Sequence, residues 1–174
     1  MSTGNWRLIS DDLNRELREM SARLTDLRPF WGDVGELLQV STERRFVTQT
    51  GPDGAKWDAN KPITIERWLM REGLQGKAAE RATARKRILR QSGALANSIA
   101  YRVDADGVQI TSGLKYAGVM QFGAPQGIFG RSRRNKPIPW GTIPARPYVG
   151  MSPKDRQGIA ETLDEHLTGG FGEP

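Results

Sequence analysis

The sequence predicts an α+β fold: a small antiparallel sheet built on a central β-hairpin, packed by an N-terminal amphipathic helix and a C-terminal helix, with long loops. The sheet is predicted by residues 99–111, where apolar and polar side chains alternate on either side of Asp106-Gly107. The helices are predicted by apolar residues that recur every three or four positions near both ends of the chain. The loops are predicted by composition, since 20 glycines and 10 prolines lie among 174 residues. This length fits one domain, residues 1–174, with one ordinary core.

Residues 1–30 are expected to contain the N-terminal helix. Ser10 is a suitable N-cap, and leucine or methionine at positions 13, 17, 20, 24 and 27 forms one narrow apolar stripe that ends before Pro29. Such a stripe packs within the chain or forms a seam with a neighbouring subunit, and both alternatives stay open. Residues 30–46 are a second and weaker helical candidate, because two glycines interrupt its first turn.

Residues 58–91 form a basic insertion that is helical or a linker. Lys77, Arg81 and Arg85 follow one another at intervals of four, so on a helix they would share a face. Such a face is a solvated linker helix, a contact for a polyanion or a contact for an acidic protein. The absence of interleaved aromatic residues favours the first interpretation.

Residues 92–150 are expected to hold the sheet and its connections. Tyr116 to Phe122 predicts one or two helical turns stopped by Gly123. Residues 124–140 predict a long basic loop, because their glycines and prolines are incompatible with regular structure. Loops of this length are usually functional or disordered. Residues 143–150 predict an edge strand, since two prolines cannot donate to a central ladder.

Residues 151–168 predict a well-marked C-terminal helix. Ser152 is the expected N-cap, Pro153 takes the first helical position, and Asp155 is the acid of a capping box. Gly169-Gly170 is expected to end the helix.

Charge is distributed unevenly along the chain. Residues 1–45 carry seven basic and eight acidic side chains, residues 46–150 carry seventeen and seven, and residues 151–174 carry two and five. A basic middle between near-neutral or acidic ends suggests a polyanion or an acidic partner surface, although the same residues can simply solvate exposed loops. The candidate contacts with DNA or a partner are the four cations of the basic loop: Arg131, Arg133, Arg134 and Lys136.

No recognisable catalytic constellation is present in the sequence. There is no cysteine, which excludes thiolate catalysis and disulfides, and His166 is the single histidine, placed where it can interact with a helix dipole. No carboxylate cluster has the spacing of a metal site or of a paired acid and base. We therefore expect no enzymatic activity, no cofactor and no metal. No run of 18 apolar residues occurs, so we expect a soluble protein made in the cytoplasm.

Six short motifs occur in a fixed order along the chain. They are Arg45-Phe46, Pro52-Asp53-Gly54 with Trp57, Ile88-Leu89, residues 92–99 (SGALANSI), Tyr116-Ala117 with Gln121-Phe122-Gly123, and residues 143–150 (IPARPYVG). Together they resemble the bacteriophage virion morphogenesis family of Mu-type tail-completion proteins over roughly residues 34–167. The motif residues that the resemblance marks as structural are Phe46, Trp57, Gly93, Leu95, Tyr116, Phe122, Gly123, Pro144, Arg146 and Pro147.

The resemblance implies a structural protein of the phage neck that completes the tail for head joining. It implies a ring, of six subunits by analogy, with tail-tube, terminator and head-neck proteins as partners and a possible non-specific DNA contact in the lumen. A tail terminator, a head-closure protein and a nucleic-acid-binding module remain alternatives, and a hydrolase would lack a visible site. For Arg146, held between two prolines, we expect a fixed ion pair with an acidic residue.

Overall fold

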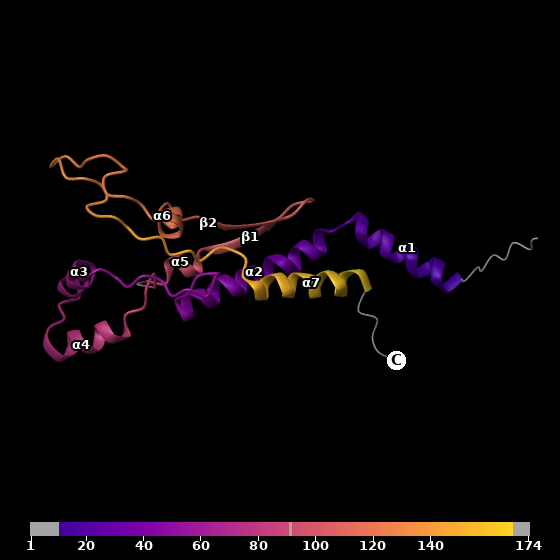
Figure 1. Cartoon of the computed structure of the whole chain (residues 1–174), viewed down its shortest axis with the longest axis horizontal. Helices are drawn as coiled ribbons and strands as arrows, with labels where there is room; N and C mark the ends of the chain where they lie inside the picture. Colours follow the sequence, from indigo (N-terminus) through magenta and orange to yellow (C-terminus); the bar gives the residue numbers. More distant parts are fainter. Residues whose placement is uncertain (1–10, 91, 169–174) are drawn as a thin grey trace, which may run out of the picture.

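The computed structural model describes residues 11–90 and 92–168 and shows an elongated molecule organised along one long helix (Figure 1). The elements in chain order are α1 (Asp11–Thr25), α2 (Arg28–Thr48), α3 (Pro62–Glu72), α4 (Gly76–Arg85), α5 (Ala94–Asn97), β1 (Ile99–Val103), β2 (Val108–Ser112), α6 (Ala117–Phe122) and α7 (Pro153–Thr168). The predicted α+β class is confirmed. Ser10 and Gly169-Gly170, which were expected to bound the terminal helices, lie outside the described residues.

Helix α2 is the axis of the molecule, and it is longer than the sequence indicates. Pro29 lies in its first turn, where a missing N–H costs nothing, and Gln49 ends it in a left-handed conformation with φ of 59°. Gly35 is buried because the hairpin crosses α2 here: a Cβ at this position would lie 2.3 Å from Cδ2 of Tyr101. A glycine that reads as a helix interruption therefore allows the helix and the sheet to approach closely.

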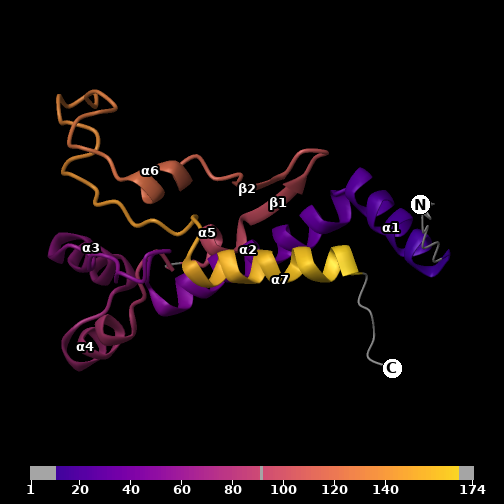
Figure 2. The same cartoon turned by 45° about the vertical axis from the view of Figure 1, so that its right-hand side comes forward.

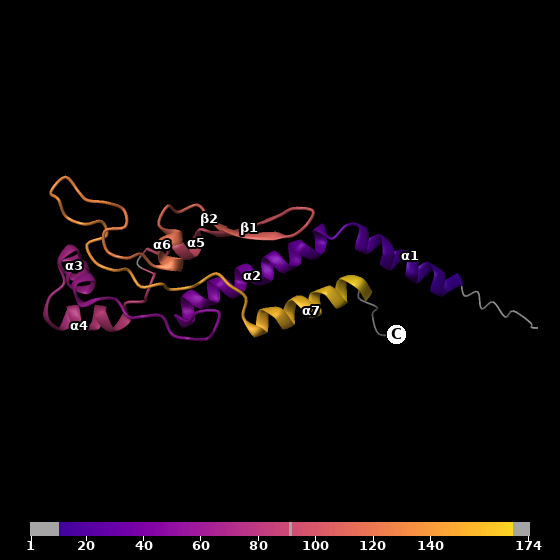
Figure 3. The same ribbon diagram turned by 45° about the horizontal axis from the view of Figure 1, so that its top comes forward.

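The predicted hairpin is present and packs on α2. Strands β1 and β2 are antiparallel, with Ile99 opposite Ser112 and Val103 opposite Val108. The turn differs from a two-residue Asp-Gly turn, since it spans Asp104–Gly107 and the Asp104 side chain accepts the N–H of Asp106 at 3.0 Å. The apolar faces of both strands lie toward α2, which makes a two-layer arrangement (Figure 3).

Helix α7 lies along the other side of α2 from the hairpin (Figures 2 and 3). Its predicted start is confirmed: Ser152 donates its backbone N–H to Oδ2 of Asp155 at 2.7 Å, and Asp155 donates its own to Oγ of Ser152 at 3.2 Å. The helix that covers the sheet is α2, whereas α1 contacts α7, where Arg23 donates to the carbonyl of Leu167 at 2.9 Å. None of the described helices is long and apolar enough to cross a membrane.

The core lies where the hairpin, α2, α5 and α6 meet. Phe46 and Trp57 pack edge to face with ring centroids 5.6 Å apart, and the ring centroid of Tyr148 lies 5.2 Å from that of Phe46. The other buried residues of this cluster are Leu95, Ala96, Ile99 and Ala117. Three residues marked as structural by the motifs, Phe46, Trp57 and Leu95, are therefore core residues.

The prediction of an edge strand at residues 143–150 is wrong. The segment is extended, but its only bridge is Ile143 to Ala124, and the backbone N–H groups of Tyr148 and Val149 donate instead to Oε1 of the Gln121 side chain, at 2.9 and 3.0 Å. Gln121 also donates to the carbonyl of Val149 at 2.8 Å. One side chain from α6 thus satisfies backbone groups that a neighbouring strand would otherwise have to pair.

Candidate interaction surface

The basic loop 124–140 projects from one end of the molecule and is held by its own backbone (Figure 1). Gly127 donates to the carbonyl of Pro139 at 3.1 Å, Phe129 to that of Ile138 at 2.8 Å, and Ile138 to that of Gly130 at 2.8 Å. The loop is therefore an ordered, hairpin-like excursion without a regular strand. Its four candidate contact residues, Arg131, Arg133, Arg134 and Lys136, are all exposed near the tip.

The insertion at residues 58–91 forms an arm of two helices, α3 and α4, beside this loop (Figures 1 and 2). Gly73 separates the helices in a left-handed conformation with φ of 66°. Neither helix contains a buried residue, and Lys77, Arg81 and Arg85 of α4 are exposed, as a basic helical face requires. The arm thus adds surface and positive charge without adding to the core.

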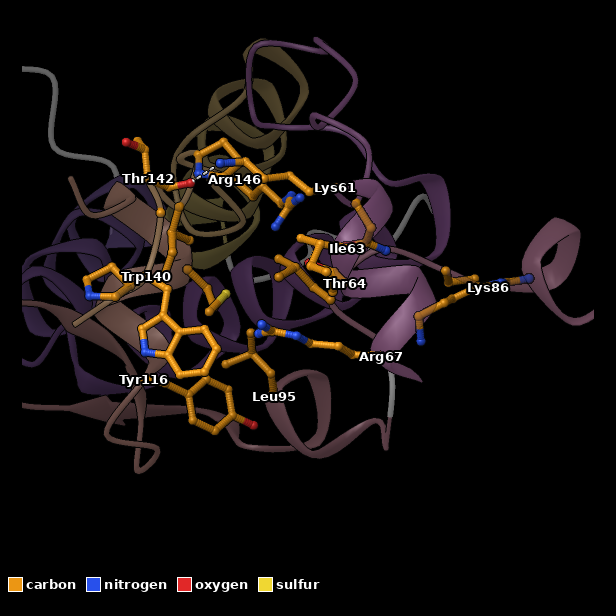
Figure 4. Close-up of a pocket in the computed structure, with 18 of the residues that line it drawn as sticks. Lys61, Ile63, Thr64, Arg67, Lys86, Leu95, Tyr116, Trp140, Thr142 and Arg146 are labelled. Carbon is orange, nitrogen blue, oxygen red and sulfur yellow. Dashed lines mark hydrogen bonds between the residues drawn. The ribbon is translucent and has the colours of Figure 1, made fainter. Parts of the chain in front are cut away.

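A groove of about 760 Å³ lies between α3, the chain after α4, α6 and the returning end of the basic loop (Figure 4). Its apolar lining includes Ile63, Leu89, Leu95, Met120 and Trp140. Its cationic residues are Lys61, Arg67, Lys86, Arg87 and Arg146. Among residues 11–90 and 92–168, no aspartate or glutamate lines it. The groove therefore presents positive charge around an apolar floor.

Neutral groups position three of these cations. Lys61 donates to the carbonyl of Thr142 at 2.5 Å, the guanidinium of Arg67 lies 4.6 Å from the ring centroid of Trp140, and Nζ of Lys86 lies 3.8 Å from that of Trp68. Burial lowers the pKa of Lys86, and the nearby charge of Arg71 lowers it further, whereas Glu72 opposes both. Cations held by carbonyls and aromatic faces keep their charge available for an incoming anion.

The prediction that Arg146 forms a fixed ion pair is wrong. Its guanidinium is buried and donates to two backbone carbonyls, that of Asp58 at 2.9 Å and that of Ala59 at 3.1 Å. Burial lowers its pKa, and the charge of Asp58 partly offsets that effect. Arg146 therefore fastens the start of the arm to the 143–150 segment, and it satisfies backbone groups where an acidic side chain was expected.

The other motif residues allow particular backbone conformations, accept a hydrogen bond through the backbone, or lie on the surface. Gly93 and Gly123 have φ of 78° and 75°, and a Cβ on Gly123 would lie 2.7 Å from the carbonyl oxygen of Ile143. The carbonyl of Pro147 accepts the indole N–H of Trp57 at 2.8 Å, and Pro144 lines the groove. Phe122, by contrast, is 79% exposed.

Four of the motif residues marked as structural line the groove: Leu95, Tyr116, Pro144 and Arg146. The groove also includes Lys61, Arg67 and Trp140, which no sequence pattern singled out. A tryptophan between two turn-rich stretches gives no periodic signal, and only the fold brings it opposite α3. Among the described residues, no group of three His, Asp or Glu side chains could hold a metal ion.

Comparison with known proteins identifies one family. Residues 9–168 match the model of the phage virion morphogenesis family, which confirms the resemblance drawn from the ordered motifs. No curated protein and no solved structure matches the chain.

Proposed function

Because the chain belongs to the phage virion morphogenesis family, we propose that it is a tail-completion protein of the neck, which forms a ring on the finished tail and makes it competent to join the head. The observation that carries this proposal is the family match over residues 9–168, which takes in both the packed core and the groove. Family membership itself makes the chain a protein of bacteriophage virion assembly.

The division of the molecule supports an assembly role. The core residues gather around α2, whereas the arm and the basic loop extend from one end and bury little (Figure 1). A subunit whose two ends differ is suited to head-to-tail contacts, which close into a ring when the rotation between copies allows it.

The basic loop is proposed to face the lumen of the ring or the adjoining ring. Its tip carries Arg131, Arg133, Arg134 and Lys136, all exposed. In the lumen these cations would contact phosphates without reading sequence, because the phosphate backbone is uniform along the duplex.

We further propose that the role is structural, with no catalytic step. His166 contacts the backbone carbonyl of Arg23 at 3.2 Å and lies 6.0 Å from the ring centroid of Phe30, so it helps to join α7 to α1 and α2. The partners proposed are further copies of the chain, the tail tube or terminator, and head-neck proteins. Assembly is proposed to occur in the host cytoplasm, and the protein would remain in the virion.

The proposal is tested by the mass of the purified protein in solution and by negative-stain images with and without purified tails. Rings, alone or on tail ends, are the expected result. A protein that stays monomeric, does not bind tails and retards DNA in a gel-shift assay at physiological salt would instead support a nucleic-acid-binding module. The exposed cations of the loop and of α4 are the observation that favours this second candidate.

The loop has its own test. Replacing Arg131, Arg133, Arg134 and Lys136 by serine should leave ring formation intact, because these side chains make no contact with the core. Head joining or DNA retention should fall, which is measured as the yield of infectious particles. A normal yield would contradict the proposed position of the loop.

A further inference from the structure

The cationic residues of the groove are separate from the loop cations that are proposed to face the lumen or the adjoining ring. Five cationic residues line it, and within residues 11–90 and 92–168 none of the five forms a salt bridge with a carboxylate. Positive charges gathered in one concave site repel one another, and an anionic partner would relieve that repulsion.

The apolar floor indicates which class of anion fits. Ile63, Leu89, Leu95 and Met120 line the same groove, and Trp140 stands at its side, 61% exposed (Figure 4). A phosphate backbone would gain nothing from these side chains. A protein segment that carries carboxylates beside apolar side chains would bury the floor and neutralise the cations at once.

The chain itself contains such a segment. From Gln157 to Pro174 the sequence has four acidic residues and no lysine or arginine. Three of the four lie on the C-terminal half of α7 and are exposed: Glu161, Asp164 and Glu165. Leu163, beside Asp164, is 37% exposed. None of the three carboxylates forms a salt bridge within the part of the chain that the structure describes.

From this complementarity we infer that the groove of one copy receives the acidic C-terminal half of α7 from the next copy. The groove and this half of α7 lie toward opposite ends of the molecule, and α7 runs away from the arm (Figures 1 and 2). Because α7 is packed along α2, its acidic half cannot reach the groove of its own chain. The contact is therefore heterologous, as a ring requires.

This inference rests on the proposed ring, and it is tested by exchanging charges in the full-length protein. The groove variant carries Arg67→Glu and Arg87→Glu. The helix variant carries Glu161→Lys and Glu165→Lys. A matched control carries Lys77→Glu and Arg81→Glu on α4, which makes the same change of charge at exposed positions that do not line the groove. Circular dichroism melting checks that all variants fold, and sedimentation measures their association.

The groove variant alone and the helix variant alone should each associate about a hundredfold more weakly than the wild type, because each places like charges face to face. An equimolar mixture of the two should recover association, since every groove then meets a helix of opposite charge. The control variant should associate like the wild type. Association of the wild type should also weaken as salt is raised.

The outcomes separate this inference from the proposed function. If the wild type forms rings and both variants form them equally well, the ring stands and the groove contact is overturned. If the wild type never associates, with or without tails, both proposals fail. If the groove variant assembles normally but loses binding to duplex DNA, the groove is a nucleic-acid site and the inference is wrong.

Discussion

Cationic side chains have different partners in the body around α2 and in the arm formed by α3 and α4. In the body, Arg45 is buried and paired with Asp155 at 2.5 Å, and it also donates to the carbonyls of Tyr148 and Gly150 at 2.9 and 2.8 Å. In the arm, Arg67 and Lys86 lie against aromatic rings. An unpaired buried charge is costly, whereas an exposed one is not. The comparison indicates that the body's charges stabilise the fold and the arm's charges remain available to a partner.

The largest expected effect compares a tryptophan of the body, Trp57, with Trp140 of the basic loop, whose ring contacts Arg67 of the arm. Trp57→Ala should lower the free energy of unfolding by about 3–5 kcal/mol, because it removes a buried ring from the core. Trp140→Ala should cost about 1 kcal/mol or less, since it removes an exposed ring and its contact with Arg67. Urea denaturation measures both. Equal losses would show that the arm and loop are part of the same cooperative core.

The second prediction concerns the buried pair of the body. Arg45→Ala should cost about 3–5 kcal/mol, because it leaves the carboxylate of Asp155 buried without its counter-ion. Arg44→Ala, at the exposed neighbouring position, should change the free energy of unfolding by less than about 0.5 kcal/mol. If the two variants were equally stable in urea, Arg45 would not hold the body together.

A smaller effect is expected where helix and sheet approach. Gly35→Ala should cost about 1–3 kcal/mol, because the new methyl group would overlap the ring of Tyr101. Gly32→Ala is the matched control: nothing lies within 4 Å of its Cβ position, so it should stabilise α2 by about 0.5–1 kcal/mol. Thermal melting distinguishes the two. A stabilised Gly35→Ala variant would mean that β1 can move away from α2 at no cost.

The pH dependence of stability should report on the same body. Burial raises the pKa of Asp155, but hydrogen bonds from Ser41 and Ser152 and the charge of Arg45 outweigh it, and the pKa lies below its ordinary value of 3.8. The ionised carboxylate therefore stabilises the fold above about pH 4, and this contribution is lost as pH falls through the folded-state pKa. The measurement is the free energy of unfolding between about pH 5 and 2 for the wild type and Asp155→Asn.

A control is needed because a second carboxylate titrates in that range. Asp26 has a pKa of about 2, since Arg28 donates to it through its side chain and its backbone. The wild type and Asp155→Asn both keep this exposed pair, so the difference between their pH profiles isolates the contribution of Asp155. Parallel profiles for the wild type and Asp155→Asn would contradict the assigned role of Asp155.

Local signals were sufficient for the hairpin and for the start of α7. The alternation around Asp106-Gly107 and the spacing of Ser152 and Asp155 act between near neighbours, so the sequence alone predicts them. The same capping acid also pairs with Arg45, which lies 110 residues away. No local pattern indicates that second contact, because it depends on how α2 and α7 come together.

The failed predictions have the same physical origin. The extended 143–150 segment was expected to pair with a strand, but the side chain of Gln121 takes that place. Arg146 was expected to pair with an acidic side chain, but it donates to the backbone carbonyls of Asp58 and Ala59. The basic loop was predicted at its correct position, whereas the groove beside it was not, since its walls come from four separate stretches of the chain.

The closed base of the basic loop has a practical consequence for labelling. Its two ends are joined by the bridge between Ala124 and Ile143, and Arg146 fastens the following chain to the start of the arm. Lengthening a loop whose ends are already held together adds only a small entropic cost, about 0.6 kcal/mol for each doubling of its length. A short epitope tag inserted between Arg133 and Arg134 should therefore be tolerated by the fold, and it would give electron microscopy a marker for the orientation of the subunit on the tail.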